Sequence, residues 1–131
     1  MLAAVGAFAS IAPAATAAPS AGEPSTPAAV QRAFTEWRSG LRHEDGELAC
    51  SRMTRAARQA VIAAMAEEGV TGLGCAVILN IAGRELWTSV KSRRLHAIVV
   101  RGARARAVTN VGSRVVFRRE SGRWKLDRPA A

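Results

Sequence analysis

His96 is the residue of this chain best placed, by type and by neighbours, to do acid–base chemistry. It falls in the alternating stretch Leu95–Arg101, where a period of two predicts that it shares a face with Ile98 and Val100. An imidazole that points inward could act as a general base near pH 7. A structural histidine, or one at a sheet edge, fits the same position, so His96 is a candidate catalytic residue and no more.

The rest of the sequence offers little support for catalysis. The chain contains no tyrosine, and no Ser–His–Asp arrangement, glycine-rich phosphate loop or pair of carboxylates stands out. Glu44, Asp45 and Glu47 cluster before a predicted helix, where carboxylates typically cap the helix and complement its dipole. We therefore favour a protein that is not an enzyme, and we expect neither a cofactor nor a metal site.

Cys50 and Cys75 are the two cysteines of the chain. In an exported domain such a pair favours a disulfide, and the helical segment between them can return the chain far enough to join them. Two unpaired buried thiols are an alternative, and a metal site is a further one, although two cysteines without a third ligand make a poor zinc site.

Basic residues dominate the charge of the chain, which carries 19 Lys and Arg against 10 Asp and Glu, for a net charge of +9. A bias toward arginine is also what a GC-rich genome produces, whereas the functional interpretation is an anionic partner. Six of these residues are predicted to share one sheet face: Arg104, Arg106, Arg114, Arg118, Arg123 and Lys125. The aromatic residues Phe117 and Trp124 alternate away from that face, so it lacks the stacking platform typical of single-stranded nucleic acid binding. The face either is simply solvated or binds a polyanion.

Residues 1–18 resemble a signal peptide, with a short apolar run and a small-x-small cleavage site at Ala15–Ala17. No Lys or Arg precedes the run, so we expect a start that is truncated, the alternative being an Ala-rich tail. Residues 19–27 are rich in Pro, Ser and Gly and are expected to form a flexible linker. No run of 18 apolar residues is present, so no membrane span is expected, and the predicted location is extracytoplasmic.

Three helices are predicted in the first part of the domain, over residues 28–42, 47–68 and 75–86. Thr26-Pro27 is a typical helix start, and an apolar stripe at helical spacing follows it: Val30, Phe34, Trp37 and Leu41. Residues 53–57, inside the second helical region, are either a turn or a continuation of the helix.

The period drops to two after Trp87, and four strands are predicted: Leu95–Arg101, Arg104–Thr109, Ser113–Arg119 and Arg123–Arg128. The short turns between them imply antiparallel hairpins, with one face apolar and the other rich in arginine. The sequence therefore predicts a single α+β domain over residues 28–128, in which three helices cover one side of a curved antiparallel sheet.

Three stretches resemble the NTF2-like superfamily, in particular its small exported members of actinobacterial type with a SnoaL-like or lumazine-binding-like cone. The first is residues 28–34, the second is the pair Ala49-Cys50 with Gly74-Cys75-Ala76, and the third is residues 99–105 followed by the closing hairpin 115–126. The resemblance implies a cone formed by helices and a curved sheet, and ligands or active sites in such folds occupy its mouth and interior. It says little about function, because one fold hosts many.

The expected function is that of an exported, accessory domain without catalytic activity. Its cone would hold a small apolar ligand, or be filled by side chains, with four residues as the expected lining: Trp37, Trp87, Ile98 and Phe117. The alternatives are an isomerase or dehydratase dependent on His96, and adhesion of the basic face to a polyanion. The protein is expected to be a monomer or a homodimer, although six like charges would oppose pairing through the outer sheet face.

Overall fold

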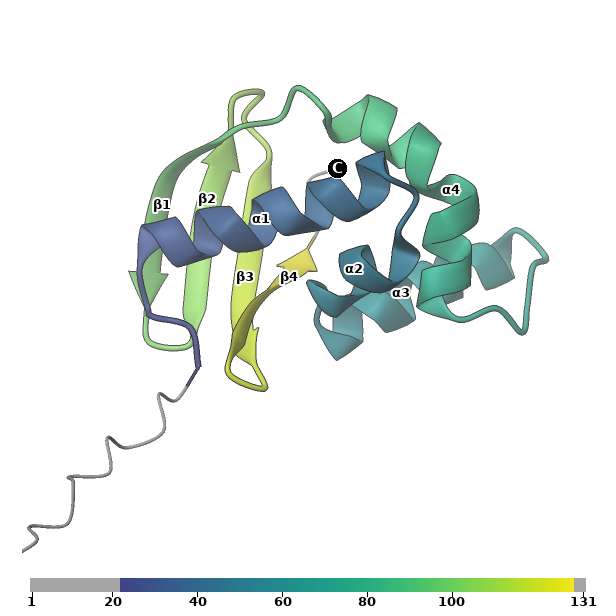
Figure 1. Cartoon of the computed structure of the whole chain (residues 1–131), viewed down its shortest axis with the longest axis horizontal. Helices are drawn as coiled ribbons and strands as arrows, with labels where there is room; N and C mark the ends of the chain where they lie inside the picture. The colour runs from purple at the N-terminus through teal and green to yellow at the C-terminus, as the bar shows by residue number, and fades with distance from the viewer. Residues whose placement is uncertain (1–21, 129–131) are drawn as a thin grey trace, which may run out of the picture.

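The computed structural model describes residues 22–128, which form four helices followed by four strands (Figure 1). In chain order these are α1 (Pro27–Arg42), α2 (Gly46–Ser51), α3 (Arg55–Glu67), α4 (Cys75–Val90), β1 (Leu95–Arg101), β2 (Arg104–Thr109), β3 (Arg114–Glu120) and β4 (Arg123–Arg128). The predicted α+β class is confirmed. The region 1–18, expected to be a signal peptide, lies outside the described residues.

The number of helices differs from the prediction, because the second helical region is two helices, α2 and α3. The chain is held in an extended form at Met53, which forms a parallel bridge with Leu126 of β4. The backbone N–H of Thr54 donates to the Leu126 carbonyl (2.9 Å), and the Leu126 N–H donates to the Arg52 carbonyl (2.7 Å). Pairing with a strand more than 70 residues away therefore interrupts the helix, which local propensity could not reveal.

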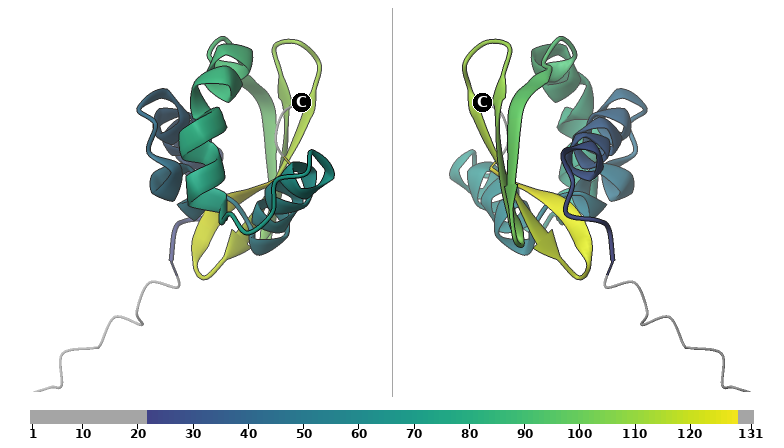
Figure 2. Two further views of the ribbon diagram at one scale, coloured as in Figure 1. Left: turned by 90° about the vertical axis from the view of Figure 1, so that its right-hand side faces the viewer. Right: turned by 90° about the vertical axis from the view of Figure 1, so that its left-hand side faces the viewer.

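The first helix begins as its sequence predicts. Thr26 is the N-cap of α1, its hydroxyl accepting from the Ala29 N–H (3.2 Å), and Pro27 occupies the first turn. The predicted stripe is confirmed, because all four of its members are buried: Val30, Phe34, Trp37 and Leu41. α1 lies across one face of the sheet, and Figure 2 shows α1 and α4 on the same side of it.

The four strands form an open antiparallel meander in the order β1-β2-β3-β4. Their bounds agree with the prediction except that β3 begins and ends one residue later. Alternate residues of β2 and of the first part of β3 are buried and exposed, as the period of two predicts. The cone that the resemblance implies stays a prediction.

The core between α1 and the sheet is filled by aromatic side chains. Phe34 stacks on Trp37, with ring centroids 5.8 Å apart, and meets Phe117 of β3 edge-on at 6.4 Å. Gly40 lets α2 approach closely, since a Cβ at this position would lie 2.5 Å from the backbone nitrogen of Ala49.

Arg52 is a buried charge at the junction of three segments. Its side chain is 3% exposed, and its guanidinium contacts Glu23 and Glu36, each at 2.6 Å. It also donates to the Trp124 carbonyl of β4 (3.1 Å). A guanidinium removed from water in this way stays favourable only when carboxylates and carbonyls satisfy it, as these three groups do.

Residues 22–26, the described part of the expected linker, have no regular structure but lie against the last hairpin. The Glu23 N–H donates to the Gly122 carbonyl (2.8 Å), and the Glu23 carboxylate accepts from the Trp124 N–H (2.8 Å). The Trp124 indole donates to the Pro24 carbonyl (2.9 Å), and Arg119 donates to the Glu23 carbonyl. The segment that leads into α1 is thus tied to β3 and β4.

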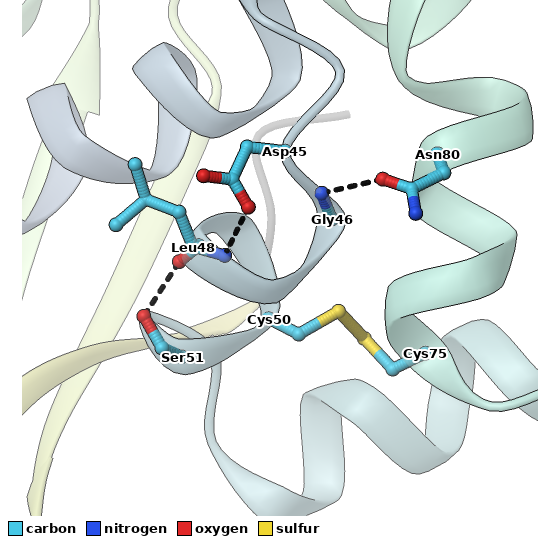
Figure 3. The surroundings of a disulfide bond; sticks show 7 residues. All are labelled: Asp45, Gly46, Leu48, Cys50, Ser51, Cys75 and Asn80. Carbon is cyan, nitrogen blue, oxygen red and sulfur yellow. Dashed lines mark hydrogen bonds between the residues drawn. A yellow bond between two sulfur atoms is a disulfide. The ribbon is translucent and has the colours of Figure 1, made fainter.

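The predicted disulfide between Cys50 and Cys75 is confirmed (Figure 3). It joins the last turn of α2 to the first residue of α4, and both cysteines are buried. The Gly46 N–H, at the other end of α2, donates to the Asn80 side chain of α4 (2.7 Å). Asp45 caps α2 by accepting from the Leu48 N–H (3.1 Å), which is the capping role expected for it. A disulfide of this kind is typical of an oxidising environment, and no helix within residues 22–128 is long and apolar enough to cross a bilayer.

Loss of the disulfide should destabilise the fold, because the bond closes a loop of 25 residues in the unfolded chain. We expect reduction to lower the free energy of unfolding by about 3 kcal/mol, measured by urea titration with and without reductant. The double variant Cys50→Ala/Cys75→Ala should have the lower stability and no response to reductant. Equal stability of the oxidised and reduced protein would contradict this expectation.

The Glu23 carboxylate should make stability depend on acid pH. Burial by itself would raise the pKa of this group, but the hydrogen bonds from Arg52 and Trp124, with the charges of Arg52 and Arg123, outweigh it and hold the pKa below its ordinary value of 4.5. The stabilisation is therefore complete above that ordinary value and is lost as the pH falls through the lowered one.

Glu23→Gln should consequently be less stable at neutral pH and lose less stability on acidification from about pH 5 to about pH 3, measured by thermal melting. Glu67→Gln, at the exposed end of α3, is the control and should follow the wild-type profile. A Glu23→Gln profile parallel to that of the wild type would rule out this role for the carboxylate.

Candidate functional site

His96 is exposed on the outer face of the sheet, the face turned away from α1. It pairs with Val108, while Val99 pairs with Arg106, so the register shifts between His96 and Val99. Ala97 stands at the shift with a φ of 51°, a left-handed backbone that is typical of a β-bulge. The prediction that His96 shares a face with Ile98 and Val100 is therefore wrong, because the bulge reverses the alternation.

The position of His96 does not favour catalysis. No ion pair within residues 22–128 includes its imidazole, so no carboxylate orients it. A general base needs an orienting partner and a pocket that excludes water, and an exposed ring on an open sheet face has neither.

The four residues expected to line a pocket divide between the core and the surface. Trp37 and Phe117 are 3% and 0% exposed and contact Phe34 in the packed interior. Ile98 and Trp87 are half-buried at the margin of that core. Trp87 also lines a surface groove between α1 and the end of α4. The two aromatic rings in the interior thus act as core side chains.

Three of the predicted basic residues, Arg104, Arg106 and Arg114, are exposed on the outer face of β2 and β3, as expected. The alternate residues of the same strands are buried beneath them: Ala105, Ala107 and Val115. Short apolar residues inside and long guanidinium groups outside give this part of the sheet one basic surface.

The other three predicted basic residues are engaged by carboxylates. Arg118 pairs with Asp127 at 3.0 Å, Lys125 lies 3.7 Å from Glu120, and Arg123 lies 3.6 Å from Glu36. Lys125 is moreover only 9% exposed. The six predicted basic residues therefore divide into two groups. One group is paired with carboxylates of the fold, and the other is not.

The unneutralised group contains one residue that sequence reasoning missed. Arg101 ends β1 directly opposite Arg104, and both line a shallow hollow of about 330 Å³ together with Val99, Ala105 and Arg106. None of Arg101, Arg104, Arg106 and Arg114 has an ion-pair partner within residues 22–128. The sequence could have indicated Arg101, because the tight turn at residues 102–103 places Arg101 and Arg104 opposite each other.

We call these four residues, Arg101, Arg104, Arg106 and Arg114, the free arginine surface. Guanidinium groups bind phosphate, sulfate and carboxylate through paired N–H donors. Residues two apart on a strand repeat every ~6.8 Å, and neighbouring strands lie ~4.8 Å apart, so the surface presents a grid of cations. Val99 and Val108 are exposed between them, and no aromatic side chain of the described strands is exposed there.

Comparison with protein-family models, with curated proteins and with solved structures finds no match for this chain. The resemblance to the NTF2-like superfamily thus stays a prediction from sequence.

The bulge at Ala97 can be tested through stability. Ala97→Gly should raise the free energy of unfolding by about 1 kcal/mol, because glycine adopts a positive φ without the steric cost of a Cβ. Ala97→Val should lower it, since a β-branched side chain is strained there. Urea titration measures both. If Ala97→Gly destabilises the protein, as glycine does in a regular strand, residue 97 is not in the left-handed conformation.

Proposed function

We propose that this protein is an exported NTF2-like domain without catalytic activity that binds an anionic polymer through the free arginine surface. The observation that carries the proposal is the division of charge on the sheet. Carboxylates of the fold neutralise Arg118, Arg123 and Lys125, while Arg101 and Arg104 with their neighbours keep their charge exposed.

The chemistry of this surface favours an extended anion over a small ligand. Its hollow is shallow and open to solvent, and its cations are spread over three strands. The binding free energies of several weak guanidinium contacts add up when one polymer carries regularly spaced phosphate or sulfate groups. Like charges held on neighbouring strands repel each other, and an anionic polymer would relieve that repulsion.

The expected location of the protein and the burial of its aromatic side chains indicate which kind of anionic polymer it binds. The disulfide and the leader-like sequence favour a location outside the cytoplasm, where anionic polymers of the cell surface are the partners at hand. Single-stranded nucleic acid is less favoured, because Trp124 and Phe117 are buried and cannot stack on bases. A small apolar ligand inside the domain is also less favoured, since Trp37 and Phe117 are themselves packed core residues.

The proposal predicts that binding depends on the position of the charges and not only on their number. The triple variant Arg104→Gln/Arg106→Gln/Arg114→Gln should bind polyphosphate more weakly than the wild type. Its plot of log affinity against log salt concentration should lose roughly 2 units of slope, by analogy with ion release from single-stranded polyanions. Isothermal titration calorimetry over a series of NaCl concentrations measures both quantities.

The matched control removes three charges from other exposed positions: Arg32, Arg55 and Arg84. The variant Arg32→Gln/Arg55→Gln/Arg84→Gln has the same net charge as the test variant and should bind nearly as well as the wild type. Equal weakening in both triple variants would show that only net charge matters, and the proposed surface would then be wrong.

A further inference from the structure

A second basic site lies on the helical side of the molecule, away from the free arginine surface. It is a groove of about 270 Å³ between α1 and the last turns of α4. Its lining consists of Thr35, Arg38, Ser39, Arg42, His43 and Trp87. Figure 1 shows the end of α4, and the chain that leads from it to β1, beside α1. The groove thus combines two guanidinium groups, one indole and no carboxylate.

Both arginines of this groove lie against the same aromatic ring. The guanidinium carbons of Arg38 and Arg42 lie 5.4 and 5.9 Å from the ring centroid of Trp87. Arg38 also lies 5.4 Å from the Phe34 ring and donates to the Lys91 carbonyl. These contacts orient the two guanidinium groups without neutralising them.

The two guanidinium groups of the groove have no carboxylate partner in the described part of the fold. Neither Arg38 nor Arg42 forms an ion pair within residues 22–128, and the nearby Glu44 is paired with Arg84 at 3.2 Å. Burial, and secondarily the charge of Arg94, lower the pKa of the Arg38 guanidinium from its ordinary value. Its Nε atom is buried without a hydrogen-bond partner. A bound anion would offset the electrostatic cost of the partly desolvated Arg38 guanidinium.

Two of the uncharged polar groups of the groove are committed to backbone carbonyls of α1. Thr35 Oγ1 donates to the Gln31 carbonyl (3.0 Å), and His43 Nδ1 donates to the Ser39 carbonyl (2.9 Å). The two arginines are the charged donors of the groove, and a pair of guanidinium groups matches the charge of a phosphate dianion.

We propose that the groove between α1 and α4 binds a small phosphate monoester, with Arg38 and Arg42 holding the phosphate and Trp87 forming the adjacent wall. The groove is near the lower limit of ordinary ligand sites, which accommodates a phosphate with a small organic substituent. The same chemistry is shared by a free phosphate monoester and by a lipid headgroup such as that of phosphatidic acid. The site is separate from the polymer surface proposed above and does not depend on it.

The test uses phenyl phosphate as the soluble probe and the full chain with its disulfide intact. In ¹H–¹⁵N NMR titrations, we expect the largest shifts at the backbone amides of residues 35–43 and at the Trp87 indole. Arg42→Gln should lower the affinity about tenfold, the loss typical of one charge-assisted hydrogen-bonding group. Arg42 is exposed, so this variant keeps the fold, which thermal melting would verify.

Two further variants separate this site from its alternatives. Arg42→Lys keeps the charge but not the forked donors and should bind with an affinity between those of Arg42→Gln and the wild type. The outer-face variant Arg104→Gln/Arg106→Gln/Arg114→Gln should bind phenyl phosphate as the wild type does, whatever its behaviour toward polyphosphate. Unchanged affinity in Arg42→Gln, or shifts centred on β1 and β2, would overturn the proposal.

A comparison of probes distinguishes the two sources of phosphate. Saturable binding of phenyl phosphate, with no added retention on phosphatidylcholine vesicles that contain phosphatidic acid, indicates a soluble ligand. Retention on those vesicles that Arg42→Gln abolishes, and that the outer-face variant keeps, indicates a lipid headgroup. Failure of both probes to bind through Arg42 would refute the phosphate site.

Discussion

The buried Arg52 guanidinium is the constraint on which the arrangement of this fold depends. It needs two carboxylates, and these come from Glu23 before α1 and from Glu36 within α1. Its backbone carbonyl and that of Leu126 meanwhile join the α2–α3 connection to β4. A charge removed from water requires all of its partners at once, so the entering segment, the first helix and the last strand are held in one relative position.

Because the chain has fewer carboxylates than basic side chains, the positions of the carboxylates determine which basic side chains remain unpaired. The chain has 10 acidic residues for 19 basic ones, and several of the acids serve the junction around α1, α3 and β4. Glu36 contacts both Arg52 and Arg123, while Glu120 lies near Arg58 and Lys125. Charge is thus neutralised where elements meet and left exposed at the β1–β2 hairpin and along the groove beside Trp87. Both proposed anion sites lie in these unneutralised regions.

Much of the fold could be predicted because its signals are local. The cap at Thr26, the apolar stripe of α1 and the alternation of β2 depend on neighbours within a few residues. The break between α2 and α3 could not be predicted, because it arises from pairing between Met53 and Leu126. The end of α4 was also predicted wrongly, because the helix continues to Val90, one turn beyond the predicted end. No glycine or proline after residue 86 marks where this helix stops.

The candidate site was predictable only in part. The sequence by itself determined which residues alternate with the core, and so placed Arg104, Arg106 and Arg114 outside. Only the tertiary structure decided that Arg118, Arg123 and Lys125 are neutralised, that a bulge at Ala97 turns His96 outward, and that Arg38 and Arg42 meet Trp87. The physical reason is that a periodic pattern reports which side of an element is buried, whereas ion pairing and ring contact depend on groups that distant parts of the chain bring together.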